Sequence, residues 1–325
     1  MVNLRAVTLT LASLTGLSSA QSFRDNIKNV VILIQENSTD IDNLRNLNRK
    51  YCNSINVTLP AATQVCATPK AGNVQPDDPG HSVSAVTFEL FSDFHPNESL
   101  PPSQVLAAEN MLGFLETEAI LFKSNNVTRA SETIIYMSEN NIPVYRTMAE
   151  NFVVFDRWFA DVPGPTNPNR AYLTSGTSHG HGKNDNDFNI FALPQRSIFQ
   201  QLSENNITWI NYFNSSFNPD SEFYSWTQST GKVASNVKPI AQFFADAKAG
   251  KLPQFTYINP ECCNFDSMHP PSPINLGEAW TKSVYEAVRG SPQWNNTLFL
   301  ISFDEHGLAY APLRFRVLCL MSIVK

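Results

Sequence analysis

Short runs that are apolar throughout alternate along this chain with segments whose apolar residues recur at helical spacing. Apolar strands separated by helices are typical of a mostly parallel sheet that is covered on both faces. The pattern therefore predicts an α/β fold, a three-layer αβα domain around one central sheet. The strand-like runs lie in residues 29–37, 150–159, 207–213, 254–260 and 297–307. The helix-like segments span residues 131–141, 196–206, 238–250 and 275–290.

Polar residues follow the first and the last of these strand-like runs. Glu36 and Asn37 come directly after the first, and Asp304 and Glu305 directly after the last. In a parallel sheet the carboxyl ends of the strands share one edge, where ligands bind. Carboxylates held together are costly unless a cation neutralises them, and oxygen ligands suit Ca²⁺, Mg²⁺ or Mn²⁺ better than zinc alone. We expect a divalent-metal cluster at this edge, with solvated loop carboxylates as the alternative that spacing alone leaves open.

The stretch VPGPTNPNRAYLTSGTSHGHG, residues 162–182, is rich in prolines, glycines and hydroxyl side chains. Its proline spacing predicts that Thr166 caps a helix that begins at Asn167 and stops at Gly176. A hydroxyl at a helix N-terminus meets exposed N–H groups and the positive end of the dipole, which favours a nucleophile and an anionic substrate. Arg170, one turn on, can bind a phosphate or sulfate oxygen. The alternative is a capping threonine with a structural arginine.

The chain contains six histidines, most of them flanked by Gly or Pro and therefore expected on turns. Histidines on loops near strand ends are candidates for acids, bases or anion binders, with structural or surface roles as the alternative. They are His81, His95, His179, His181, His269 and His306.

The overall composition is that of a globular protein, because 42% of the 325 residues are hydrophobic and 16% are charged. This length allows one large domain or two smaller ones. The formal net charge of −6 argues against a nucleic-acid partner, since such proteins need Lys and Arg to neutralise phosphates.

The N-terminus, residues 1–20, has the pattern of a secretory signal peptide, with a buried core helix as the alternative. Arg5 precedes an apolar segment too short to span a bilayer, and small residues precede Gln21. Cys52 and Cys66 bracket a short loop and are spaced for a disulfide, which also favours an extracellular protein. Sequons for N-glycosylation agree with secretion. They begin at Asn37, Asn56, Asn97, Asn126, Asn206, Asn214 and Asn295.

Several motifs in order along the chain are similar to one family. They are VVILIQEN, DDPGH, ENFVVFDRWFADVPGPTNPNRAYLTSGT, SMHPP and TLFLISFDEHG. Together they resemble the phosphoesterase family of bacterial and fungal phospholipases C and related acid phosphatases, within the alkaline phosphatase superfamily. The resemblance implies an alkaline-phosphatase-like fold.

The resemblance also implies a role for each matching residue. Thr166 matches the nucleophile that forms a covalent phospho-enzyme, and Arg170 would steady the nucleophile turn and the bound oxyanion. His81 and His269 match histidines that line the family's site, where one protonates the leaving group, and His306 adjoins the metal-binding pair. The residues that match the family's metal cluster, for Ca, Mg, Mn or Zn, are Glu36, Asn37, Asp304 and Glu305.

These features lead us to expect a secreted phosphodiesterase of the phospholipase C type. Its substrate would be a phospholipid or a small phosphate ester, with transient contact to a membrane surface and no nucleic-acid partner. One alternative is an acid phosphatase, a phosphomonoesterase that uses the same groups. The other is a catalytically inactive secreted glycoprotein that keeps the fold and the anion site.

The end of the chain departs from the family. After DEHG it continues as LAYAPLRFRVLCLMSIVK, which does not resemble the family's sequence. We therefore expect a C-terminally truncated catalytic domain over residues 21–308, followed by an atypical tail, residues 309–325.

Overall fold

The computed structural model describes residues 25–35, 52–60, 63–75, 77–155, 158–214, 219–260, 267–306 and 319–322. Its central sheet has the strand order β4-β9-β8-β1-β7-β5-β6. The run from β8 to β6 is parallel throughout, and β9 is antiparallel to both β8 and β4. The predicted mostly parallel sheet is confirmed. The strands are β1 Asn29–Gln35, β4 Val153–Phe155, β5 Trp209–Phe213, β6 Val237–Pro239, β7 Phe255–Asn259, β8 Thr297–Phe303 and β9 Cys319–Ser322.

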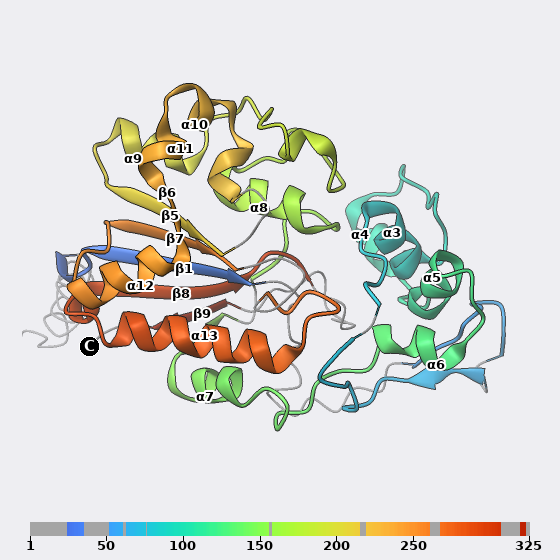
Figure 1. The fold of residues 1–325 in the computed structure, drawn as a ribbon. Helices are drawn as coiled ribbons and strands as arrows, with labels where there is room; N and C mark the ends of the chain where they lie inside the picture. Colours follow the sequence, from blue (N-terminus) through green and yellow to red (C-terminus); the bar gives the residue numbers. More distant parts are fainter. Residues whose placement is uncertain are drawn as a thin grey trace, which may run out of the picture.

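Helices cover both faces of this sheet (Figure 1). Val31 and Leu33 of β1 lie in a buried cluster with residues of α7, α12 and α13. Ile34 of the same strand points to the other face, into a cluster with residues of α8 and α9. The three-layer αβα arrangement is therefore confirmed. The covering helices are α7 Pro143–Asn151, α8 Thr166–Ser175, α9 Ile198–Glu204, α10 Ser225–Ser229, α11 Lys232–Asn236, α12 Ile240–Ala249 and α13 Ile274–Arg289.

The helix predicted for residues 131–141 is wrong beyond its first turn. A short 3₁₀ helix covers Ser131–Thr133, and the chain then leaves helical geometry. The Tyr136 N–H donates to the Thr68 carbonyl at 3.0 Å, and the Ala71 N–H donates to the Tyr136 carbonyl at 3.0 Å. Pairing with a distant segment thus replaces the hydrogen bonds that a helix would have made with itself.

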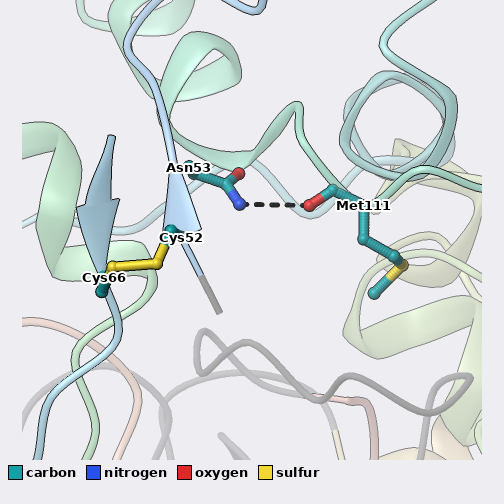
Figure 2. Close-up of a disulfide and its surroundings, with 4 residues drawn as sticks. All are labelled: Cys52, Asn53, Cys66 and Met111. Carbon is teal, nitrogen blue, oxygen red and sulfur yellow. Dashed lines mark hydrogen bonds between the residues drawn. A yellow bond between two sulfur atoms is a disulfide. The ribbon is translucent and has the colours of Figure 1, made fainter. Parts of the chain in front are cut away.

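A separate group of helices, α3 to α6, lies beyond the carboxyl ends of the strands (Figure 1). The predicted disulfide between Cys52 and Cys66 is present and joins the two strands of a small hairpin beside these helices (Figure 2). Asn53, fully buried, donates to the Met111 carbonyl at 3.1 Å and accepts from the Phe114 N–H at 3.0 Å, which fixes the hairpin to α5. The elements are β2 Cys52–Asn53, β3 Val65–Cys66, α3 Val83–Phe91, α4 Pro102–Ala108, α5 Phe114–Leu121 and α6 Val127–Ala130.

Part of the tail after residue 308 belongs to the central sheet. The sequence predicts that residues 309–325 lie outside the catalytic domain. Strand β9 nevertheless pairs with residues 299–302 of β8 on one side and with β4 on the other. The tail therefore contributes backbone pairing to the same sheet that carries the predicted metal-binding end of β8.

The predicted signal peptide, residues 1–20, lies outside the described residues. Within the part of the chain that the structure describes, we find no helix that is long and apolar enough to cross a membrane.

Candidate active site

The start of α8 is shaped by one buried asparagine. The Asn169 side chain, 3% exposed, accepts from the Val162 N–H at 2.9 Å. It donates to the carbonyls of Val162, Gly164 and Pro165 at 3.1, 2.9 and 3.2 Å. These bonds fold the proline-rich turn back onto the helix and fix the half-buried Thr166 at its first position. This role of Asn169 cannot be predicted from the sequence, because the run NPNR contains several polar residues and nothing local shows which side chain is buried.

Thr166 is the first helical residue and not the cap, so the predicted capping role is wrong. Pro165 takes the cap position with extended backbone, and α8 ends at Gly176 in the left-handed conformation, as predicted. The Asn167 N–H, which was expected to be open to an anion, receives the Asn184 side-chain oxygen at 2.8 Å. Asn184, a loop residue, thereby satisfies one of the backbone N–H groups at the helix N-terminus, where the sequence predicts that an anionic substrate binds.

Arg170 joins α8 to the end of β8. Its side chain is buried, its Nε donates to Asp304 Oδ2 at 2.9 Å, and its Nη1 donates to Asp220 Oδ1 at 3.3 Å. The anionic groups that the structure places on this guanidinium are carboxylates of the protein itself. Asp220 was missed from the sequence, because its segment resembles an ordinary polar loop.

The carboxyl ends of β1 and β8 lie side by side, as predicted. The two strands are parallel neighbours with Gln35 opposite Phe303, and the Asp304 N–H donates to the Gln35 carbonyl at 3.0 Å. Asp304 and Glu305 are 5% and 2% exposed, so solvated loop carboxylates are excluded for this pair. The other two predicted metal ligands, Glu36 and Asn37, lie outside the described residues.

Two more buried carboxylates come from the helical group. Glu89 of α3 and Glu118 of α5 are 4% and 2% exposed. Burial raises the pKa of Glu89 well above its usual range, and the negative charges of Glu118 and Glu305 raise it further. Burial also raises the pKa of Glu118 to about 7. The sequence could not reveal either residue, since burial of a charged helical residue depends on what the helix packs against.

This concentration of buried acid fits a divalent cation. Asp304 and Glu305 offer carboxylate oxygens at one strand end, and both side chains are buried. Arg170 brings one positive charge to Asp304. Oxygen donors of this kind suit a hard cation such as Mg²⁺, Ca²⁺ or Mn²⁺.

His81 and His269 meet, although 188 positions separate their numbers in the sequence. Their ring centroids are 6.5 Å apart, and Asp78 lies between them, 3.7 Å from His81 Nδ1 and 3.6 Å from His269 Nε2. Each Nδ1 also has a backbone carbonyl within 2.7 Å, that of Pro79 for His81 and that of Pro270 for His269. Because a carbonyl only accepts, each Nδ1 carries a proton and each Nε2 is the nitrogen that can exchange one.

The histidine pair is held near the Thr166 turn by close packing. A Cβ added to Gly164 would come within 3.0 Å of Val83 Cγ2, and one added to Gly182 within 3.1 Å of the same atom. Val83 is the first residue of α3, two positions after His81. The turn before Thr166 therefore lies against the segment that carries His81, and a Cβ at either glycine would have to displace the Val83 side chain.

His306 is buried at the end of β8, with 9% of its surface exposed. Burial, together with the smaller effect of the positive charge of His81, lowers the pKa of His306 to about 3. The imidazole is therefore neutral over the physiological range. The structure brings His306 into the electrostatic reach of His81, next to the predicted metal pair.

A second group of metal-ligand type lies in the loop after α8. His181, Asp185 and Asp187 have ligand atoms within 4.8 Å of one another. His181 Nδ1 is 2.7 Å from Asp185 Oδ2, and its Nε2 is 3.6 Å from Asp187 Oδ2. Each ring nitrogen of His181 therefore faces its own carboxylate.

Comparison with known proteins shows the family of the chain. The model of the phosphoesterase family matches residues 27–312. Non-specific phospholipase C6 of Arabidopsis thaliana is 35% identical over 302 residues, which cover 87% of this chain and 54% of the relative. Non-specific phospholipase C4 of the same plant is 32% identical, with 87% and 54% covered. The non-hemolytic phospholipase C of Burkholderia pseudomallei is 22% identical, with 55% of this chain and 30% of the relative covered.

The chain spans about half the length of the curated plant relatives that it matches. Among solved structures, Ps i-CgsB in complex with k-i-k-neocarrahexaose aligns with a TM-score of 0.35 and 14% identity, covering 60% of this chain and 61% of that one. A likeness that low carries no argument about function. The family model matches residues 27–312, which are most of the chain. The chain therefore belongs to the phosphoesterase family.

Proposed function

We propose that this protein is a phosphoric-ester hydrolase of the phospholipase C type that acts through Thr166. The observation that carries the proposal is the Arg170–Asp304 ion pair, which fastens the helix of Thr166 to the buried carboxylates at the end of β8. A hydroxyl at a helix N-terminus beside such a group is the arrangement that phosphoryl transfer uses. Family membership and the names of the plant and bacterial relatives support the same reaction.

The residues of this chain take the following roles in the proposal. Thr166 gives up its hydroxyl proton to solvent and attacks the phosphorus atom in line with the leaving alcohol, so that a new bond from its oxygen to phosphorus forms as the bond to the alcohol breaks. His81 or His269 donates a proton from Nε2 to the departing oxygen. Water then hydrolyses the phosphothreonine and restores the hydroxyl. Arg170 holds the start of α8 and Asp304 in one geometry throughout.

Asp304 and Glu305, together with Glu36 and Asn37, which follow β1 in the sequence, would hold a divalent cation. When bound, the cation supplies positive charge that lowers the pKa of the nucleophilic hydroxyl and screens the phosphoryl oxygens.

We also propose that the protein is secreted and N-glycosylated. The Cys52–Cys66 disulfide supports an oxidising compartment. Exposure of sequon asparagines supports glycosylation, because an acceptor side chain must be accessible. The exposed ones are Asn56, Asn97, Asn126, Asn206 and Asn295.

The test is hydrolysis by the full chain of p-nitrophenylphosphorylcholine and of p-nitrophenyl phosphate, each with and without a chelator. Cleavage of the choline ester that the chelator abolishes supports the phospholipase C assignment. Cleavage of the monoester alone supports the acid phosphatase alternative, and cleavage of neither supports the inactive binding glycoprotein.

The Thr166→Ala variant tests the nucleophile. We expect it to lower turnover by at least about 10⁴-fold, since the covalent step is lost. The matched control is Ser175→Ala at the other end of α8, where the hydroxyl donates to the Ala171 carbonyl at 2.8 Å. Ser175→Ala should keep wild-type turnover, and equal activity of Thr166→Ala and the wild type would overturn the assignment.

A further inference from the structure

Asp220 is a buried carboxylate whose two oxygens are both engaged. It opens the 3₁₀ helix Asp220–Phe223 and is 1% exposed. Its Oδ1 accepts from Asn259 Nδ2 at 2.9 Å and from Arg170 Nη1 at 3.3 Å. Its Oδ2 accepts from the Tyr257 hydroxyl at 2.6 Å. An acidic side chain with this much hydrogen bonding is fixed in place by its surroundings.

The groups that hold Asp220 come from two neighbouring strands, β7 and β5. Tyr257 and Asn259 belong to β7, and Asn259 Oδ1 accepts from the Asp220 N–H at 3.3 Å. Asn211 of β5 donates to Asn259 Oδ1 at 2.8 Å and accepts from the Ser221 N–H at 3.0 Å. The sheet itself therefore sets the position of Asp220, since strands are its rigid part.

Tyr257 remains a hydrogen-bond donor toward Asp220 over the working pH range. Burial and the negative charge of Asp220 raise the pKa of Tyr257 well above its usual range. A neutral tyrosine can donate to a carboxylate oxygen, whereas a tyrosinate cannot. The contact of Tyr257 with Asp220 is thus a persistent constraint on the carboxylate.

Arg170 is shared between Asp220 and Asp304, and the sharing has an electrostatic consequence. Both carboxylates and the guanidinium are nearly fully buried, so their mutual attraction is weakly screened. With Asp220 in place, Arg170 neutralises Asp304 only in part. Without it, the guanidinium would lose one of its two carboxylate anchors, and its contact with Asp304 and the start of α8 would be held less firmly.

We propose that Asp220 is a positioning residue of the phosphoryl-transfer site. It holds Arg170 between the end of β7 and the end of β8, so that α8 presents Thr166 at a fixed place beside Asp304. This inference rests on the function proposed above, in which Thr166 is the nucleophile. Asp220 itself acts through Arg170 and not by contact with substrate.

A double-mutant cycle tests the proposal on the full chain. We expect Asp220→Asn to lower the turnover of p-nitrophenylphosphorylcholine by about 100-fold, the loss that a misplacement of about 1 Å produces, with a KM changed by less than about threefold. The Asp220→Asn/Arg170→Lys double variant should be no slower than Arg170→Lys alone, because the two substitutions disrupt the same contact between Asp220 and Arg170. Losses that multiply in the double variant would overturn the proposal.

A matched pair of tyrosines separates positioning from general stability. Tyr257 donates to Asp220 at 2.6 Å, and Tyr212 on the next strand donates to Asp246 at 2.7 Å, away from the site. Tyr257→Phe should lower turnover by about threefold to tenfold, whereas Tyr212→Phe should leave turnover unchanged. The two variants should lose a similar amount of thermal stability. Equal turnover in the two variants would contradict the inference, and these mild substitutions remain informative if Asp220→Asn fails to fold.

A measurement that needs no activity keeps the two proposals distinguishable. The Arg170 Nε–H proton, assigned by its absence in Arg170→Lys, should be protected from solvent exchange in NMR spectra of the wild type. Asp220→Asn, or Tyr257→Phe to a smaller degree, should reduce that protection. Unchanged protection would overturn the role of Asp220 even in an active enzyme. A wild type that hydrolyses neither ester would instead overturn the proposed function, while the Nε–H result would still decide whether Asp220 holds Arg170.

Discussion

The candidate site has two sides that are built differently. The nucleophile side comprises the turn before Thr166, α8 and the end of β8, and it is held by buried hydrogen bonds of Asn169 and by the buried ion pair of Arg170. The histidine side comprises His81 and His269 with the segments around them. Its imidazoles lie 14% and 16% exposed on loops, with Asp78 between them.

The difference matches what each side has to do. A nucleophile must stay in one place, and buried, fully hydrogen-bonded groups provide that. A proton donor must exchange with water, so it needs partial exposure and a pKa that neighbouring charges can tune. One feature of the histidine side is nevertheless buried: Glu118 accepts from the Gly80 N–H at 2.8 Å and so holds the residue next to His81.

Substitution of Asn169 should produce the largest loss on the nucleophile side. Asn169→Asp keeps the acceptor for the Val162 N–H but sets an oxygen against three carbonyls, so we expect the free energy of unfolding to fall by about 3–5 kcal/mol in urea titrations. The control is Asn184→Ala, an exposed residue with one bond to the Asn167 N–H, which should cost about 1 kcal/mol. Equal losses in the two variants would show that the turn is not held by Asn169.

Substitutions on the histidine side should lower turnover and should hardly change the free energy of unfolding. We expect His81→Gln and His269→Gln each to lower turnover by about 10²–10³-fold, with the free energy of unfolding changed by less than about 1 kcal/mol. The residue that protonates the leaving group should lose more with an alkyl ester than with a p-nitrophenyl ester, because p-nitrophenolate leaves readily without a proton. His95→Gln, at an exposed position, is the control. A large loss of stability in either variant would remove the distinction between the two sides.

The pH dependence of stability should show the smallest effect and should trace to Glu118. Its pKa rises from 4.5 to about 7 on burial, so the folded protein binds this proton more tightly than the unfolded chain does. The contribution is fully present below pH 4.5 and is lost as pH rises through about 7, an overall change of about 3 kcal/mol. Thermal or urea unfolding between these pH values would measure it.

Glu118→Gln should flatten that slope, since the amide does not titrate and still accepts from the Gly80 N–H. Glu118→Ala removes the acceptor as well and should lower stability at every pH. A slope that is the same in the wild type and in Glu118→Gln would assign the pH dependence to another group.

The regular elements of the sheet were predictable from the sequence. The runs that became β1, β5, β7 and β8 are mostly apolar, as is typical of strands covered on both faces, so local pattern and final environment agree. Residues 131–141 show the opposite case. Backbone hydrogen bonds of Tyr136 with Thr68 and Ala71 replace the helix that their spacing predicts. No local sequence pattern indicates such long-range bonds.

The candidate site was predictable only in part. The residues that stand in distinctive local motifs were found from the sequence, and the structure brings Arg170 to Asp304 and His81 to His269. Asn169, Asp220 and Glu118 were missed, because a polar residue in a turn, a loop or a helix looks the same whether it is exposed or buried. Their roles arise from burial, which is a property of the packed chain.

The sequence by itself determined the α/β class, the shared sheet edge at which the carboxyl ends of the parallel strands meet, the helix beginning near Thr166 and the Cys52–Cys66 pair. These follow from local hydrophobic period, proline and glycine placement, and short loop closure. Only the tertiary structure decided that Arg170 is shared by Asp304 and Asp220, that Asp78 lies between two histidines, and that Glu89 and Glu118 are buried. Such contacts join segments far apart in the chain, and their charge states depend on the low-dielectric surroundings that folding creates.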